Sequence, residues 1–386
     1  MANRRSHLIL IGLILAALVG VAVLAVPGSP AHKKVILGLD LQGGLEVVLK
    51  AVPPPHKTCD AACMDRSISI MRSRIDKLGV SEPEIRKQGA NQIVIQLAGV
   101  RNVNQAAKII GTTAQLQFYD LENDVTGPST DGSGNVVAST SLFQLLNKVK
   151  GDTKKGTPTQ YYLFNAKHRV IAGPEATRGK LLDTPKLNGK VPPGAVLLAA
   201  PQKTTVISCD AIDGCPGVQQ AQAAAPTFFY LFKFDPNNQR HPVPEATGGD
   251  LKLSGIRADI STQGQGNIVQ LAFTGEGAKK FHDITRAEAV RGSIAANAAG
   301  QTGSDLATVT RFAQHFAIVL DNQLRSTPYI DYKQNPDGID PSSGTGGAEI
   351  SNIYSFSEAK NLALVLLTGA LPVKFEPIER TDVSAT

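Results

Sequence analysis

The sequence contains no tryptophan, and aromatic residues make up only 5% of its 386 residues. This scarcity argues against a lectin-like or base-stacking site, because such sites depend on exposed aromatic rings. A strong charge of one sign is also missing, since 39 Lys and Arg face 33 Asp and Glu and leave a net charge of +6. That modest excess suits a surface near anionic lipid head groups or an acidic partner. The basic residues are not clustered densely enough to indicate nucleic-acid binding.

The short motifs of common catalytic sites are absent as well. The sequence has no Gly-x-Ser-x-Gly segment and no His-Glu-x-x-His segment. The stretch 38–44 superficially resembles a phosphate loop, but it lacks the Lys-Ser/Thr pair that contacts phosphate and magnesium. The seven histidines are scattered singly, which favours surface or core roles over metal binding. We therefore expect that the protein is not an enzyme and that it binds neither a cofactor nor a metal ion.

Cysteine is scarce, and the four residues form two close pairs, Cys59 with Cys63 and Cys209 with Cys215. In an exported chain this arrangement indicates two local disulfides. Free thiols and a single four-cysteine zinc site are the alternatives. Zinc would require the two distant pairs to converge, and neither pair has the Cys-x-x-Cys spacing common in such sites. Disulfides that close such small loops would have local effects.

One long apolar run lies near the N-terminus. Residues 8–26 carry no charge, and as a helix they would extend roughly 28 Å, close to the roughly 30 Å hydrocarbon core of a bilayer. Arg4 and Arg5 precede the run, which predicts a cytoplasmic N-terminus and an extracytoplasmic remainder. A cleaved signal peptide ending at small residues 29–31 is the alternative, but this run exceeds the usual 7–15 residues of a signal core.

The segment 33–120 has the pattern of a compact α/β domain. Its expected elements are strand 45–52, helix 64–78, hairpin 84–87 and 92–97, helix 103–110 and strand 116–119. This order predicts a ferredoxin-like sandwich. The basic residues of the first helix fall mostly off its apolar stripe, so we expect them on a solvated face: Arg66, Arg72, Arg74 and Lys77.

The segment 121–250 is rich in Gly, Pro, Ser, Thr and Asn and has strand-like islands at 161–164, 169–172, 195–199 and 228–234. We interpret it as an insertion with a small β-rich component. Regular patterns return after it: strand 268–273, helix 275–290, hairpin 316–320 and 324–330, strand 348–351, a helix opened by a capping box at 355–358, and strand 371–378. Segment 358–375 resembles 104–118, which suggests two related α/β units in an α+β chain.

Six blocks without catalytic signatures occur in a fixed order, at 37–44, 74–83, 92–99, 273–281, 317–321 and 369–372. In this order they resemble the SecD family, an accessory subunit of the bacterial Sec protein-export machinery. The resemblance covers 1–120 and 250–381. The motif positions that carry it are Asp40, Gln42, Gly43, Gly44, Gly79, Glu82, Pro83, Gly99, Gly277, Asp321, Gly369 and Pro372.

The resemblance implies a division into a cytoplasmic tip and transmembrane helix (1–32), a periplasmic base (33–120), the insertion (121–250), a head (251–370) and a final base strand (371–386). It implies a cell-membrane protein that works with SecF and the SecY-SecE-SecG channel, and that helps the proton-motive force draw unfolded preproteins outward. The base would lie near the membrane and a mobile head would capture the preprotein. In the family the proton-relay residues lie in later membrane helices, so we expect none here and expect the chain to be truncated.

A binder of unfolded chains is best served by an apolar groove or a free strand edge, because backbone pairing does not depend on side chains. The strands around 268–273 and 316–330 are the candidates for such a groove or edge. Two rival functions stay open. One is a membrane-anchored extracytoplasmic hydrolase whose catalytic residues, for example a carboxylate pair, meet only in the fold. The other is an envelope scaffold with a large exposed apolar patch.

Overall fold

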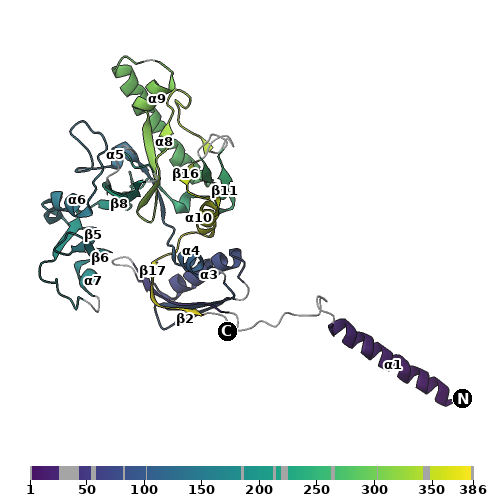
Figure 1. The fold of residues 1–386 in the computed structure, drawn as a ribbon. Coiled ribbons are helices and arrows are strands. Elements are labelled where there is room, and N and C mark those ends of the chain that lie inside the picture. Colours follow the sequence, from purple (N-terminus) through teal and green to yellow (C-terminus); the bar gives the residue numbers. More distant parts are fainter. Residues whose placement is uncertain are drawn as a thin grey trace.

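The computed structural model describes residues 2–25, 43–53, 58–80, 83–100, 102–183, 187–211, 214–218, 225–261, 266–301, 303–341 and 348–383. Three of the predicted motif residues, Asp40, Gln42 and Glu82, lie outside these ranges. The described residues form a mixed α+β body, and helix α1 (Ala2–Ala25) lies apart from it (Figure 1).

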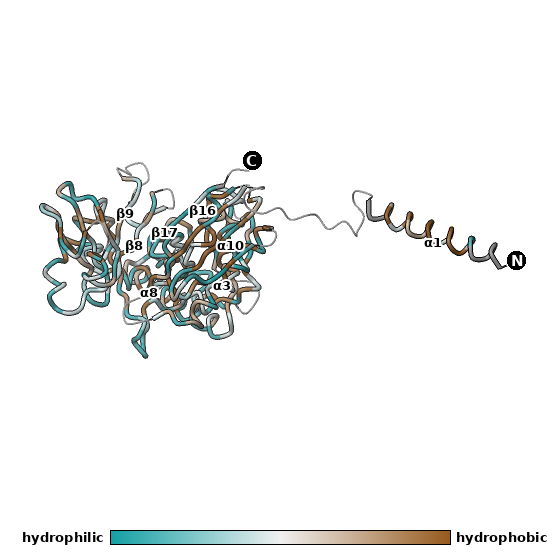
Figure 2. The backbone as a smooth tube through the Cα atoms, turned by 90° about the horizontal axis from the view of Figure 1, so that it is seen from below, coloured by the Kyte–Doolittle hydropathy of each residue, from teal (hydrophilic) through white to brown (hydrophobic). Residues whose placement is uncertain are grey.

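Helix α1 carries the apolar run noted in the sequence. Its large apolar side chains from Ile9 to Val21 are each more than half exposed, and hydrophobic colour runs along the helix in Figure 2. Among the described residues no helix is both long and apolar enough to cross a membrane. The structure thus does not show the spanning helix predicted at 8–26, whose last residue lies outside the described range.

One antiparallel sheet forms the base, in the order β17-β1-β3-β2. Its strands are β1 (Gly44–Val52), β2 (Glu84–Gln88), β3 (Gln92–Ala98) and β17 (Lys374–Val383). Helices α3 (Ala61–Lys77) and α4 (Val103–Gly111) pack on one face, where Met64, Met71 and Ile75 join the strand residues in a buried core. Asn102 caps α4, because its side chain accepts a 3.0 Å hydrogen bond from the Gln105 N–H.

Of the two strands expected in this sheet besides β1, β2 and β3, namely 116–119 and the final base strand at 371–386, only the latter lies in it. The strand expected at 116–119 exists as β4 (Leu116–Asp120), but it pairs with β13 (Gln314–Leu320) and β10 (Ala246–Thr247) in another sheet. The chain end, β17, takes the place beside β1 instead.

The head is built around two sheets. The larger has the order β10-β4-β13-β14-β8-β9, where β14 is Gln323–Ser326, β8 is Thr204–Asp210 and β9 is Thr227–Lys233. The smaller has the order β11-β12-β16, with β11 at Arg257–Ile260, β12 at Asn267–Gln270 and β16 at Glu349–Ile353. Helix α8 (Gly275–Ala298) packs on β13 and helix α10 (Phe356–Thr368) packs on β11 and β12, so both sheets share one core.

Most of the strands expected to offer free edges have neighbours on both sides. Strand β12 lies between β11 and β16, and β13 lies between β4 and β14 while also pairing with β15 (Tyr329–Ile330). The prediction of a free edge is therefore wrong for β12, β13 and β14, whereas β15, at the end of 316–330, pairs only with β13 among the described strands. Strands this apolar are buried on both faces, and a central position in a sheet buries them best.

The expected insertion contains two parts. Strands β5 (Gln160–Phe164), β6 (Val170–Glu175) and β7 (Val196–Ala200) form a sheet in the order β6-β5-β7. Helix α6 (Leu142–Lys148) covers one face of it and α7 (Arg178–Leu182) covers the other. Strands β8 and β9, in contrast, extend the larger head sheet through β14. The four predicted strand islands correspond to β5, β6, β7 and β9, whereas β8 was missed.

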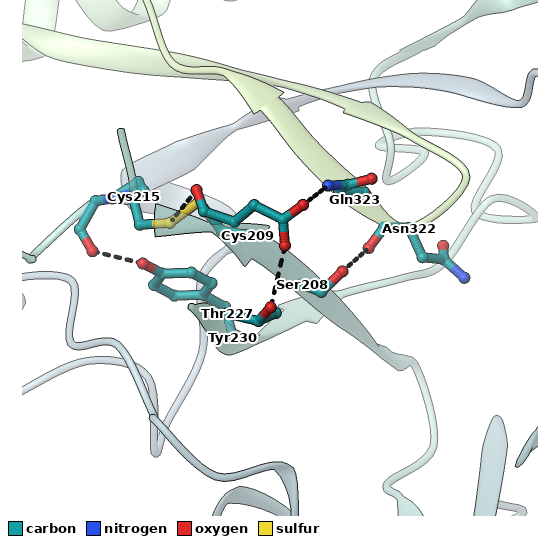
Figure 3. Close-up of a disulfide and its surroundings, with 9 residues drawn as sticks. Ser208, Cys209, Cys215, Thr227, Tyr230, Asn322 and Gln323 are labelled. Atoms are coloured by element: carbon teal, nitrogen blue, oxygen red, sulfur yellow. Dashed lines mark hydrogen bonds between the residues drawn. A yellow bond between two sulfur atoms is a disulfide. The ribbon is translucent and has the colours of Figure 1, made fainter. Parts of the chain in front are cut away.

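The join between β8 and the head is shown in Figure 3. A disulfide links Cys209 to Cys215 at the end of β8, and another links Cys59 to Cys63 in the base. Beside the former, the Gln323 side-chain amide donates a 2.6 Å hydrogen bond to an Asp210 carboxylate oxygen (Figure 3). The inserted β8–β9 hairpin is thereby fastened to the head by side chains as well as by strand pairing.

Candidate functional site

Arg74 occupies the junction between base and head. It lies on α3 and is fully buried, so the prediction that it belongs to a solvated helix face is wrong, whereas Arg66, Arg72 and Lys77 are exposed as predicted. Its Nε atom donates to the Thr368 hydroxyl at 3.2 Å. Its terminal nitrogens donate to the carbonyl oxygens of Ile109 (3.0 Å), Ile110 (3.1 Å), Thr112 and Gly369 (2.9 Å).

These acceptors explain why an arginine is buried there. They belong to the C-terminal ends of α4 and α10, where backbone carbonyls have no partner within the helix. A guanidinium group supplies five donors and a positive charge, which also suits the negative end of a helix dipole. Burial lowers the pKa of Arg74 to about 10, and the negative charge of Asp321 partly opposes this shift. Arg74 therefore stays charged at neutral pH and ties two helix ends together.

Asp321 completes the junction from the head side. It stands at the turn between β13 and β14 with a positive φ of 52°, and its carboxylate accepts hydrogen bonds from the N–H groups of Ala114 (3.1 Å) and Gln115 (2.9 Å). Burial raises the pKa of Asp321, while these two hydrogen bonds and the charge of Arg74 oppose the shift. The carboxylate thus fixes the segment by which the chain first leaves the base.

The chain crosses between base and head twice, and the two crossings lie side by side. The Leu371 N–H donates a 2.8 Å hydrogen bond to the Thr113 carbonyl. Nearby, the Gln105 side chain on α4 donates a 2.9 Å hydrogen bond to the Asn361 side chain on α10. Arg74, Asp321 and Gly369 come from three of the six sequence blocks, so the fold brings separate motif segments to one place.

A cavity of about 300 Å³ opens beside these crossings. Side-chain amides, charged groups and apolar side chains from α4, α10, β16 and the β13–β14 hairpin line it: Gln105, Lys108, Ile109, Thr112, Leu320, Asp321, Gln323, Arg325, Ile353, Glu358, Asn361, Leu362 and Val365. Side-chain amides pair with peptide groups of any sequence, and the apolar wall offers contact without a fixed shape. This mixture suits an extended peptide better than a small charged metabolite.

Among the other described motif residues, Pro372 follows Leu371 at the second crossing. Gly43 and Gly99 lie together at the ends of β1 and β3, where the Gly99 N–H donates to the Gly43 carbonyl at 2.9 Å. The other described motif residues lie at the ends of helices and strands. Gly44 is the first residue of β1, Gly79 follows α3 at a positive φ, Pro83 precedes β2, and Gly277 lies in the first turn of α8.

Sequence reasoning missed Arg74 because it counted only apolar residues as the buried face of α3. Ser67, seven residues earlier, is also fully buried, so a polar line runs beside the apolar stripe. An arginine that lies two helical turns from a small polar residue, next to the apolar stripe, is a signal that the buried face of the helix extends beyond its apolar residues.

A second group of polar side chains lies inside the head. Glu288 on α8 is fully buried, and its two carboxylate oxygens have no hydrogen-bond partner among the described residues. Close by, an Arg291 guanidinium nitrogen donates to both carboxylate oxygens of Asp120, at 2.6 and 2.7 Å. The His315 Nδ1 atom lies 2.7 Å from a carboxylate oxygen of Glu122. Burial raises the pKa of Glu288 well above its usual range, and the charges of Asp120 and Glu122 add to this. Within the described ranges no group of His, Cys, Asp and Glu could hold a metal ion.

Comparison with known proteins identifies two matching family models. One, described as the N-terminal part of the P1 domain of protein translocase subunit SecDF, matches residues 64–123, which include Arg74. The other, described as the P1 head subdomain of SecDF, matches residues 237–373, which include Asp321 and Gly369. Residues 124–236 lie outside both matches.

Two relatives and one solved structure illustrate the similarity. Protein translocase subunit SecD of Acidaminococcus fermentans is 38% identical over 374 residues, which are 97% of this chain and 53% of that protein. SecD of Streptomyces coelicolor is 28% identical over 387 residues, covering 92% of this chain and 63% of that protein. A crystal structure of SecDF in its super-membrane-facing form is 24% identical, with a TM-score of 0.45, over 98% of this chain and 35% of that one. The chain spans 53% to 63% of the length of these two relatives.

Proposed function

Because the chain belongs to the SecD family, we propose that it acts as an accessory subunit of the Sec protein translocase and handles emerging preproteins on the extracytoplasmic side. The observation that carries this proposal is the junction around Arg74. Three segments that resemble the family in sequence meet there and hold base and head together through a charged, fully buried side chain.

We propose the following organisation for that role. The base is a ferredoxin-like unit, which the element order β1-α3-β2-β3-α4-β17 and the sheet order β17-β1-β3-β2 support. It comprises most of 33–120 together with 371–386, the head comprises 251–370, and the insertion comprises 121–250. Strands β4, β8 and β9 join the head by pairing, so the head reaches beyond its sequence limits.

The membrane placement is likewise a proposal. Residues 8–26 anchor the chain in the cell membrane with the N-terminus in the cytoplasm, as the uncharged apolar run and the preceding Arg4 and Arg5 favour. The partners would be the lipid bilayer, the SecY-SecE-SecG channel, SecF and the unfolded preprotein. The family description names SecDF, which supports SecF as the neighbour.

The preprotein contact that we propose is the cavity beside the junction. Amide side chains such as Gln105 and Asn361 can pair with a peptide backbone, and Leu362 and Val365 offer apolar contact. Since base and head both contribute to the lining, a bound peptide would hold the two parts in one relative position. Arg74 then has a functional as well as a structural role, because it sets how the lining elements meet.

A matched crosslinking experiment tests this function. A photo-crosslinking residue replaces Lys108, an exposed residue that lines the cavity on α4, or Lys77, an equally exposed residue of α3 outside the cavity. Membranes containing this chain, the Sec channel and a preprotein stalled in transit are then irradiated. We expect a crosslink to the preprotein from position 108 and little from position 77. Equal yields at both positions, or none at 108, would contradict the proposal.

A further inference from the structure

The inserted subdomain around β5, β6 and β7 concentrates the positive charge of the whole chain. Residues 142–200 contain ten Lys and Arg against three Asp and Glu, an excess of seven. The rest of the chain carries 29 basic and 30 acidic residues and is close to neutral. This segment lies within 124–236, outside both family matches. Its charge therefore has no explanation in the junction or in the base–head architecture.

The basic side chains of this subdomain face water. All that the structure describes are exposed: Lys148, Lys150, Lys154, Lys155, Lys167, Arg169, Arg178, Lys180 and Lys190. Among these described residues only Lys155 forms an ion pair, with Asp152 at 2.8 Å. The positive field is thus not neutralised within the protein, and it favours the approach of an anionic surface.

Strand β6 adds an apolar component at the centre of this charge. It is an edge strand, and its Val170 and Ile171 are 45% and 47% exposed. Lys167 and Arg169 lie in the turn before it, and Arg178 and Lys180 lie on α7 directly after it. The turn is held in place because the His168 ring stacks on Phe143 of α6, with ring centroids 3.7 Å apart. A pair of exposed apolar side chains flanked by cations matches the boundary between lipid head groups and acyl chains.

The subdomain also lies beside the base. The Lys180 Nζ atom donates a 2.9 Å hydrogen bond to the carbonyl of Pro53, directly after β1. Figure 1 shows α7 and β6 next to β17, at the base end of the molecule rather than at the α9 end of the head. Since the base follows α1 in sequence, a bilayer that holds α1 is the polyanion kept at high effective concentration near this surface.

We propose that the β5–β6 turn, the exposed edge of β6 and the start of α7 form a membrane-contact surface that binds anionic phospholipid head groups. This inference rests on the proposed function in one respect, namely that α1 anchors the chain in a bilayer. The contact would hold the inserted subdomain against the membrane and so restrict how the attached head sheet moves. A mobile acidic segment of a protein matches this surface less well than a lipid bilayer does. Such a segment would gain little from contact with the two exposed apolar side chains of β6.

The absence of tryptophan allows a direct test. The full chain carrying Ile171→Trp is placed in nanodiscs of phosphatidylcholine alone or with 30% phosphatidylglycerol, and quenching by bromine-labelled lipid is measured. We expect quenching in the anionic discs to exceed that in the neutral discs at least threefold and to fall towards the neutral level in 0.5 M salt. The added pair Lys167→Glu and Arg169→Glu should abolish the difference. Circular dichroism establishes that each variant is folded.

The control reverses two charges elsewhere by the same amount. Lys279→Glu and Arg286→Glu change exposed residues of α8 in the head, and they should leave the quenching unchanged. Equal quenching in neutral and anionic discs, or equal loss in both charge-reversal pairs, would overturn the proposal. So would binding of polyglutamate at this edge without lipid quenching, because it would assign the surface to an acidic protein. If the chain does not remain with the discs at all, the anchor assumed in the proposed function has failed instead.

Discussion

The Arg74 guanidinium donates a 2.9 Å hydrogen bond to the Gly369 carbonyl, across a separation of 295 residues. Gly369 ends α10 at a φ of 87°, a backbone region that glycine adopts without the strain other residues incur. The same guanidinium binds carbonyls at the end of α4, so one side chain closes two helix ends at the point where the chain passes between base and head. The stability of this junction should depend on Arg74 far more than on other arginines of α3.

Arg74→Lys is expected to lower the free energy of unfolding by about 2–4 kcal/mol. Lysine keeps the charge, but its single nitrogen cannot reach acceptors on both helix ends, which leaves buried carbonyls without donors. Urea unfolding followed by circular dichroism measures the loss. Arg72→Lys changes an exposed residue of the same helix and should alter stability by less than about 0.5 kcal/mol. Equal effects of the two variants would show that the buried contacts contribute nothing.

Asp321→Asn should loosen the first crossing. The variant loses the negative charge near Arg74 and retains only one oxygen for the two N–H groups of Ala114 and Gln115. A cost of about 1–3 kcal/mol is expected. Hydrogen exchange of these two amides should quicken more than exchange in β1. Unchanged protection at both amides would argue against Asp321 as the residue that holds this segment.

Gly277→Ala should be destabilising by about 2 kcal/mol or more, because the added Cβ would stand 2.1 Å from the Asp250 carbonyl oxygen. The neighbouring Gly275→Ala is the matched control, since a Cβ there meets nothing within 4 Å. At the start of α8 that change should be neutral or stabilise by up to about 1 kcal/mol. Thermal unfolding of both variants measures the difference, and equal melting temperatures would refute the close contact.

Glu288 should make the head less stable as the pH rises above the ordinary carboxyl pKa. Burial raises its pKa, and the charges of Asp120 and Glu122 add to that shift while Arg291 opposes it. Above the ordinary carboxyl pKa of about 4.3 the folded state then holds a proton that the unfolded state has lost. The resulting stabilisation is fully present below that pH and is lost as the pH rises towards the raised pKa, with a slope of at most about 1.4 kcal/mol per pH unit.

Glu288→Gln tests this origin of the pH dependence. The amide keeps the shape of the side chain and cannot ionise, so the decline in unfolding free energy between pH 5 and pH 8 should become shallower. Glu276→Gln alters an exposed carboxylate of the same helix and should leave the slope as it is. Urea unfolding at several pH values measures both variants. A slope that Glu288→Gln does not change would assign the pH dependence to other groups.

The sequence by itself determined the local structure of this protein. Ser355 begins its helix as expected, since a cap depends only on residues within one turn. The turn at Asp321 and the hairpin of β2 and β3 follow from neighbouring residues as well. The paired cysteines are close enough in sequence for each disulfide to form without the rest of the fold. The six blocks that resemble the family could also be recognised in the sequence, because each block is a continuous segment of the chain.

Tertiary structure alone decided the parts that depend on distant segments. The element order alone placed 116–119 in the base sheet, whereas in the fold β4 pairs with β13 and β17 pairs with β1. Strands β12 and β13, for which we expected free edges, have neighbouring strands on both sides. The partners of Arg74 lie 35 to 295 residues away in sequence, at the ends of α4 and α10, so only the fold brings them together. A buried charge is stable only where several acceptors converge, and convergence is a property of the folded chain.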